Sequence, residues 1–254
     1  MTQAAGERIG GMRIDAHHIF SATRGPAGLW PILERNRFEG SVLIQPAAST
    51  EATEAALAQA LELDFIKGVS AWVDLAKQDL DLLQSNPKFC GVCVALDGVL
   101  DLREAANRDL TVDICLKTHQ FKFIEATLEQ AHGARLVLED LGNPEISVEG
   151  FEKWAFMVEN VARFETVSMK LSGLPSLAGQ RPWNAANLKP FVQHAINCFG
   201  PERLLFGSGW PDILEQGTWK ESLAAFTQSI GAHSIDFREK LLGANAKRVY
   251  RLAM

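Results

Sequence analysis

Short apolar runs alternate along the chain with longer segments in which apolar residues recur every three or four positions. The short runs predict buried strands, and the spacing of three and four predicts amphipathic helices. This alternation is typical of parallel strands joined by crossover helices. The predicted strands are Met12–His17, Ser41–Gln45, Lys67–Val73, Phe89–Ala95, Thr111–Leu116, Arg135–Glu139, Thr166–Lys170 and Arg203–Ser208.

Helices are predicted between these strands, and Ser49 is placed to cap the first of them. The predicted helices are Glu51–Leu61, Phe121–Ala131, Val148–Val161, Leu188–Cys198, Trp219–Ile230 and a last one from Leu242 to Arg251. Eight predicted strands in 254 residues match a single (β/α)8 TIM-type barrel, which typically needs about 250 residues. We expect residues 1–11 to form a flexible N-terminal arm and residues 12–254 to form one barrel domain.

The composition, 47% hydrophobic and 22% charged, is that of a globular domain. A net charge of -6 gives no general attraction to nucleic acid or to anionic membranes. No apolar run approaches the ~18 residues that span a bilayer, and the first residues lack the apolar core of a secretory signal. We therefore expect a cytoplasmic protein that binds a small molecule, and association into a homo-oligomer stays open.

The chain has four cysteines, too few for a disulfide framework in 254 residues. Cys90 and Cys93 have the C-x-x-C spacing, but they lie inside a predicted strand with no second ligand pair nearby. Packed, reduced thiols are favoured over a metal or redox site.

Polar side chains gather where the predicted strands end. The carboxyl ends of barrel strands share one face, so these side chains are expected to converge there. They are Asp15, His17, His18, Gln45, Trp72, Asp74, Lys117, His119, Glu139, Asp140, Lys170, Ser172, Ser208, Trp210 and Asp212.

Five ordered stretches resemble the amidohydrolase-2 branch of the metal-dependent hydrolases, which includes sugar-lactone and pyrone-dicarboxylate lactonases. The stretches are Met12–Phe20 with Asp-Ala-His-His, Gly68–Leu75, Leu136–Pro144, Val167–Leu174 and Leu205–Pro211. The resemblance runs from about Met12 to Leu252. It implies the barrel fold and hydrolysis of a lactone by water that a carboxylate activates.

The chain departs from the family pattern at four positions of the implied site. Ile19 replaces the second His of Asp-x-His-x-His, and Asp140 replaces the His of Asp-His-x-Gly-x-Pro. Cys93 stands where the family has a substrate-binding Arg, and Gly209 stands where it has the catalytic Asp. Loss of two imidazoles leaves a set poor in the nitrogen donors that zinc favours. We therefore predict that the protein needs no metal and no other cofactor.

Catalytic roles are assigned to His17, Asp140, Asp212 and Lys170. His17 is the one family histidine that this chain retains. It is predicted to accept a proton or to hydrogen-bond a bound carbonyl, and the alternative is that its side chain only packs. Asp140 can act as base, bind hydroxyls or a cation, or hold a hard cation with Asp15. Asp212 is a relocated base or the cap of a turn, and Lys170 stabilises an oxyanion or pairs with Asp140 or Glu139.

The remaining side chains are predicted to contact substrate, with packing or backbone hydrogen bonding as the alternative for each. They are Asp15, His18, Gln45, Trp72, Ser172, Ser208 and Trp210. In particular, we expect Asp15, His17, Asp140, Lys170 and Trp210 to line one pocket.

The sequence thus favours a lactonase-like hydrolase acting on a small sugar-derived or carboxylated lactone, with altered or lost activity left open. One alternative is a non-catalytic member that binds a small molecule or serves a structural role. A further alternative is an isomerase or decarboxylase on the same barrel.

Overall fold

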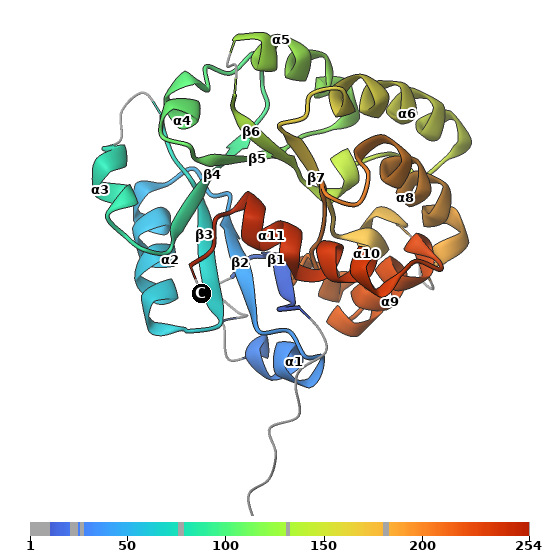
Figure 1. The fold of residues 1–254 in the computed structure, drawn as a ribbon, viewed down its shortest axis with the longest axis horizontal. Helices are drawn as coiled ribbons and strands as arrows, with labels where there is room; N and C mark the ends of the chain where they lie inside the picture. The colour runs from blue at the N-terminus through green and yellow to red at the C-terminus, as the bar shows by residue number, and fades with distance from the viewer. Residues whose placement is uncertain are drawn as a thin grey trace, which may run out of the picture.

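Eight parallel strands form one sheet whose order follows the sequence (Figure 1). The computed structural model describes residues 11–20, 25, 28–75, 79–130, 133–179 and 183–253. A parallel bridge between His18 and Trp210 joins the first strand to the segment after the last one, which brings the sheet round into a barrel. The strands are β1 (Ile14–His18), β2 (Gly40–Gln45), β3 (Ile66–Trp72), β4 (Phe89–Ala95), β5 (Thr111–Cys115), β6 (Arg135–Leu138), β7 (Val167–Leu171) and β8 (Leu204–Phe206).

The predicted (β/α)8 barrel is confirmed, because each predicted strand exists and helices lie outside the ring (Figure 1). The predicted N-terminal arm lies outside the described residues except for Gly11. No helix in the described part of the chain combines the length and apolar character that crossing a membrane requires.

The longer helices cover the outer face of the sheet. They are α2 (Thr50–Glu62), α5 (Lys122–Gln130), α6 (Val148–Ala162), α8 (Ala185–Phe199) and α9 (Trp219–Ile230), all of which the sequence predicts. The shorter helices are α1 (Trp30–Arg35), α3 (Leu80–Gln84), α4 (Arg103–Asn107), α7 (Leu174–Leu177) and α10 (Ile235–Glu239). Short turns are η2 (Thr118–Gln120), η4 (Asp212–Glu215) and the left-handed η3 (Asp140–Gly142). Ser49 caps α2 as predicted, since its hydroxyl accepts a hydrogen bond from the Ala52 backbone N–H at 3.3 Å.

The predicted last helix begins as a π-helical turn, η5 (Lys240–Ala244), and continues as α11 (Asn245–Val249). Thr111, the first residue of β5, donates its hydroxyl to the Val249 carbonyl at 2.7 Å. Asn245 donates its amide to the carbonyl of Leu204, the first residue of β8, at 2.8 Å. The α11 segment therefore closes the amino-terminal end of the barrel, and the carboxyl ends of the strands remain for a site (Figure 1).

Candidate active site

A cavity of about 230 Å³ lies at the carboxyl ends of β1, β6, β7 and β8. Its described lining residues are His17, Ile19, Asp140, Asn143, Gly173, Ser176, Leu177, Gly209 and Asp212. His17, Asp140 and Asp212 are thus brought together as the sequence predicted. Their chemical roles stay predictions.

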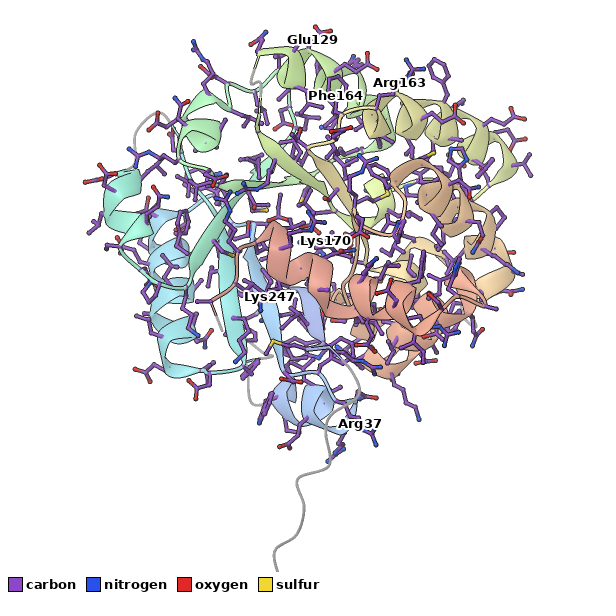
Figure 2. The ribbon with its side chains drawn as sticks, viewed as in Figure 1. Arg37, Glu129, Arg163, Phe164, Lys170 and Lys247 are labelled. Carbon is purple, nitrogen blue, oxygen red and sulfur yellow. The ribbon has the colours of Figure 1, made fainter. Side chains whose placement is uncertain are left out.

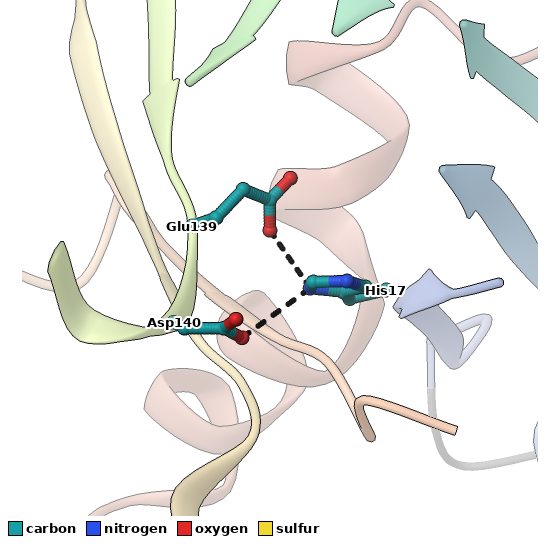
Figure 3. Close-up of side chains that lie close together, drawn as sticks. All are labelled: His17, Glu139 and Asp140. Atoms are coloured by element: carbon teal, nitrogen blue, oxygen red, sulfur yellow. Dashed lines mark ion pairs between the residues drawn. The ribbon is translucent and has the colours of Figure 1, made fainter. Parts of the chain in front are cut away.

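His17 is held between two carboxylates (Figure 3). Its Nδ1 lies 2.8 Å from Glu139 Oε2 and 3.5 Å from Asp140 Oδ1, and the Ser172 hydroxyl lies 3.2 Å away. Burial alone would lower the pKa of His17, but the charges of Glu139 and Asp140 raise it to about 9. The ring is therefore a cation at neutral pH, suited to donate a hydrogen bond and not to accept a proton.

Asp140 is aimed by an unusual backbone turn. Asp140, Leu141 and Asn143 have φ of 47°, 58° and 51°, and Gly142 between them has φ of 70°. Left-handed backbone costs roughly 1–2 kcal/mol for each residue other than glycine, and such strain clusters at functional sites. The buried Leu141 carbonyl accepts a hydrogen bond from Trp154 Nε1 at 2.8 Å, which fixes the turn.

Ser172 holds Asp140 from the neighbouring strand. Its hydroxyl donates to Asp140 Oδ1 at 2.7 Å and accepts from the Asp140 backbone N–H at 3.1 Å. Ser172 is fully buried and does not line the cavity, so it positions Asp140 and His17 and does not meet the substrate-contact role predicted for it.

Asp212 is the first residue of the η4 turn and is exposed to solvent on the cavity side. Pro211 holds the cap position of η4, and the alternative of a capping role for Asp212 is not what the structure shows. Burial of part of the side chain raises the pKa of Asp212, while the charge of His17 acts in the opposite direction. Asp212 is thus a carboxylate with raised basicity beside a cation.

Lys170 lies inside the barrel, well away from solvent (Figure 2). Its Nζ donates to Glu139 Oε1 at 2.6 Å and to Asp113 Oδ1 at 2.8 Å. Tyr250, from the segment that closes the barrel, donates its hydroxyl to the same Asp113 oxygen at 2.5 Å. We call Glu139, Lys170, Asp113 and Tyr250 the interior column; it runs from the closed end of the barrel to His17.

The charges of the interior column balance one another. Burial alone would raise the pKa of Glu139, yet the cations of His17 and Lys170 hold it below its usual range. Burial raises the pKa of Asp113 to about 6, and Lys170 counteracts this. Burial opposes the charged form of Lys170, but Asp113 and Glu139 raise its pKa. The expectation that Lys170 lines the pocket and stabilises an oxyanion is therefore wrong, because its side chain is fully buried. The alternative that Lys170 pairs with Glu139 is confirmed, and Asp113 is a second partner.

Three other predicted site residues also turn inward. Asp15 is fully buried, and its carboxylate accepts hydrogen bonds from the Ser208 backbone N–H at 2.8 Å and from Trp219 Nε1 at 2.7 Å. The Ser208 hydroxyl accepts from the Trp210 backbone N–H at 3.1 Å, and Trp210 packs edge-on against Phe20. The predicted lining of the pocket by Asp15 and Trp210, and the substrate contact predicted for Ser208, are wrong because these residues join the ends of β1 and β8.

His18 and Trp72 also lie away from the cavity. His18 is fully buried, and burial lowers its pKa to about 3, which leaves a neutral ring 4.9 Å from the Phe20 ring. Trp72 is half-buried at the end of β3, where its carbonyl accepts a hydrogen bond from the Thr53 hydroxyl at 2.7 Å. Gln45 lines a second cavity next to the first.

Glu139 was expected only among the polar side chains at the strand ends and as an alternative partner of Lys170, and Asp113 and Tyr250 were not predicted near the site. A usable signal existed, since Asp113 interrupts an apolar strand and Tyr250 is the one tyrosine of the chain. Charged residues are almost never fully buried without a partner, so Asp113 requires a cation such as Lys170. All four cysteines are free, and Cys93 is buried, as predicted.

His17, Glu139 and Asp140 are the group in the described residues whose ligand atoms, within 4.8 Å of one another, could hold a metal ion. This group offers one nitrogen donor and two carboxylates, whereas zinc sites favour several nitrogen or sulfur ligands. Glu139 is also bonded to the Lys170 ammonium, which would repel a nearby cation. The donor set does not fit a catalytic zinc.

The backbone at Gly209 explains why a side chain is missing there. Gly209 has φ of 72°, and a Cβ at this position would lie 3.1 Å from Gly173 Cα and 3.3 Å from Gly173 N. The approach of these two glycine backbones closes the cavity floor between β7 and β8. An aspartate at this position would need both a strained backbone and a shift of its neighbour.

A family model described as amidohydrolase matches residues 40–252. The chain belongs to the amidohydrolase family. This amidohydrolase is 28% identical to an L-fucono-1,5-lactonase of Burkholderia ambifaria, over 90% of this chain and 85% of the relative. Its fold matches an amidohydrolase of Burkholderia multivorans crystallised with bound zinc, with a TM-score of 0.84, 24% identity and coverage of 96% and 100%. It also matches a protein of Pseudomonas putida assigned as a 2-pyrone-4,6-dicarboxylic acid hydrolase, with a TM-score of 0.82, 16% identity and coverage of 96% and 98%.

Proposed function

We propose that this amidohydrolase hydrolyses a small, neutral lactone. The observation that carries the proposal is the meeting of the His17 cation with the Asp140 and Asp212 carboxylates around one cavity of about 230 Å³. A cation beside two carboxylates can stabilise an oxyanion while a carboxylate takes a proton from water. The similarity to an L-fucono-1,5-lactonase supports this reaction type.

His17 polarises the lactone carbonyl in this mechanism. Nδ1 is held by Glu139, so Nε2 is the ring nitrogen left to donate a hydrogen bond to the carbonyl oxygen. Glu139 keeps the ring protonated and oriented, and Lys170 holds Glu139 in place although its own charge lowers the pKa of His17. Lys170 is therefore a positioning residue that acts through Glu139.

Asp212 activates water. Its carboxylate accepts a proton as the water oxygen bonds to the carbonyl carbon, and negative charge collects on the oxygen that His17 holds. The tetrahedral intermediate then breaks the ring C–O bond, and the departing alkoxide takes the proton back from Asp212. Asp140, fixed by Ser172, binds the water or a substrate hydroxyl.

The charge of the cavity favours a hydroxylated ring over a carboxylated one. Asp140 and Asp212 would repel a substrate carboxylate, and Cys93 stands where lactonases of this branch carry a cation. A sugar-derived lactone has hydroxyls that can donate to both carboxylates.

A lactone panel with matched variants tests the assignment. Asp212→Asn should lower kcat by about 10²-fold or more, because the amide cannot accept the proton. Glu215→Gln, on the same η4 turn, is the control and should leave kcat unchanged. Efficient hydrolysis that survives in both Asp212→Asn and Asp140→Asn would show that the water-activating group is wrongly assigned.

We also propose that catalysis is independent of metal, since the site offers one imidazole and Lys170 already binds Glu139. Metal analysis of the purified protein should find no stoichiometric zinc, and chelator should leave both kcat and the melting temperature nearly unchanged. One tightly held transition metal per chain, lost together with activity, contradicts this proposal. A cytoplasmic location is part of the proposal and is supported by four free cysteines.

A non-catalytic member of the family is the second candidate, and Gly209 is the observation that favours it. No turnover of any lactone at any pH, together with saturable binding of a lactone, would favour this candidate over hydrolysis.

A further inference from the structure

The side chains around the candidate active site differ in chemistry. The charged and neutral polar residues among those described in its lining are His17, Asp140, Asn143, Ser176 and Asp212. Ile19 and Leu177 bring hydrocarbon to the same cavity, and both are half-buried, so part of each side chain is open to a ligand. Ile19 stands where the family pattern has a histidine, so this part of the wall is apolar in this chain and polar in the pattern.

The position of Ile19 is fixed by the backbone. Its N–H donates to the Trp210 carbonyl at 2.8 Å, which extends the pairing between β1 and the segment after β8. Residues two apart on extended chain place their side chains on one side, roughly 7 Å from each other, and His17 and Ile19 both line the cavity. Branching at Cβ restricts the rotamers of Ile19. The Ile19 side chain is therefore a fixed apolar neighbour of the His17 ring.

Ser176 and Asp140 supply hydrogen-bonding groups elsewhere in the cavity. Ser176 lies on α7, which the buried Leu174 and Pro175 hold against the barrel. Its side chain is exposed, and its hydroxyl has no hydrogen-bond partner among the residues that the structure describes. The Asp140 carboxylate accepts from Ser172 and is still 39% exposed. Both groups are thus available to the hydroxyls of a ligand.

A sugar-derived 1,5-lactone presents two different sides to this cavity. On one side of the carbonyl, C2 carries a hydroxyl; on the other side, beyond the ring oxygen, C5 carries hydrogen, a methyl or a hydroxymethyl group. A hydroxyl placed against Ile19 would give up its hydrogen bond to water and gain none. With the carbonyl at His17, the C5 side therefore faces Ile19, and the hydroxyls of C2 to C4 face the polar groups.

We propose that the site selects 1,5-lactones that carry an alkyl group on C5, as 6-deoxyaldono-1,5-lactones do, and that Ile19 determines this selectivity. The C5 methyl packs against the Ile19 side chain, while ring hydroxyls bind Asp140 and Ser176. This inference rests on the proposed lactonase function, because His17 orients the ring through its carbonyl.

A series of three lactones isolates the group on C5. A pentono-, a 6-deoxyhexono- and a hexono-1,5-lactone of one configuration at C2 to C4 carry hydrogen, methyl and hydroxymethyl there. After subtraction of spontaneous hydrolysis, kcat/KM of the wild type should be about tenfold higher for the methyl compound than for either of the others. A methyl compound that is no better than one of the others would overturn the proposal.

Two substitutions at residue 19 test whether Ile19 is the contact. Valine and threonine have nearly the same shape and are both branched at Cβ, but threonine has a hydroxyl in place of a methyl group. Ile19→Val should keep the preference for methyl over hydroxymethyl, whereas Ile19→Thr should lower it about tenfold, because its hydroxyl can bind the hydroxymethyl group. Each ratio is measured within one variant, so a loss of folded protein cancels. The same ratio in both variants would show that residue 19 does not contact the C5 group.

A binding measurement distinguishes failure of this inference from failure of the lactonase proposal. The 1,5-lactams that correspond to the methyl and hydroxymethyl lactones resist lactone hydrolysis, and calorimetry with the full chain gives their Kd values. Tighter binding of the methyl lactam that is lost in Ile19→Thr but kept in Ile19→Val, without turnover of any lactone, supports the selectivity and rejects the lactonase. Turnover of all three lactones with equal kcat/KM does the reverse.

Discussion

Glu139 and Asp140 are neighbours in the chain, yet they face two different regions of the molecule. The Glu139 side chain is 2% exposed and belongs to the interior column, whereas that of Asp140 is 39% exposed and lines the cavity. In the column every charge meets an opposite charge at hydrogen-bond distance. In the cavity, Asp140 and Asp212 have His17 as their common cation. The charges of the interior column therefore pair with one another inside the barrel, and the carboxylates of Asp140 and Asp212 remain available for a ligand.

Removing the cation of the column should have the largest effect. Lys170→Met leaves Glu139 and Asp113 buried without their shared partner, which should cost about 3–5 kcal/mol of unfolding free energy. Urea unfolding measures this cost, with Lys189→Met, exposed on α8, as the control. A loss no larger than that of the control would show that the column does not stabilise the fold.

His17 connects the two regions, and the pH dependence of activity should reveal this. With a pKa of about 9, His17 is charged at neutral pH and loses its proton as pH rises. Activity that needs this cation should fall about tenfold per pH unit above 9 and should also fall in acid, where Asp212 becomes protonated. The stability that charged His17 adds is fully present below pH 6.5 and is lost as pH rises through 9.

A pH profile of kcat/KM measures this dependence, and Asp140→Asn should move the alkaline limb to lower pH because it removes one of the charges that raise the pKa of His17. An alkaline limb near pH 6.5 in the wild type would show that the ring is not held as a cation.

Gly209→Asp tests the cavity side with a smaller expected effect. The left-handed backbone and the contact with Gly173 should cost about 1 kcal/mol of stability, and activity should not rise, because Ile19, Cys93 and Asp140 remain changed. Denaturation and lactone hydrolysis measure both, with Gly98→Asp, which has open space around it, as the control. A large gain of activity would show that the wild-type rate is limited by the missing family carboxylate and that Asp212 does not replace it.

The sequence predicted the strands well because parallel barrel strands are apolar on both faces, as in Val42 to Ile44 and Leu204 to Phe206. It missed α1, α3, α4, α7 and α10, since helices of four to six residues show too little of the helical period. Among site residues, His17, Asp140 and Asp212 were placed correctly at the cavity.

Lys170 was misplaced because a position near a strand end does not determine whether its side chain points up to the mouth or across the barrel. Pairing with Glu139 was an alternative that the sequence left open, whereas Asp113 lies on another strand and no local pattern links it to Lys170. Long-range pairing of this kind follows from the closure of the sheet.

The left-handed turn from Asp140 to Asn143 makes the site easier to alter by substitution than by insertion. Its shape depends mainly on Gly142, on buried Leu141 and on the hydrogen bond from Trp154, although the φ of 47° at residue 140 favours Asp, Asn or Gly there. A side chain that tolerates this backbone, such as Asn, therefore starts in the same direction as Asp140, whereas an added residue would destroy the turn. A single substitution at residue 140 can therefore change the charge at the mouth of the barrel and leave the backbone around it in place.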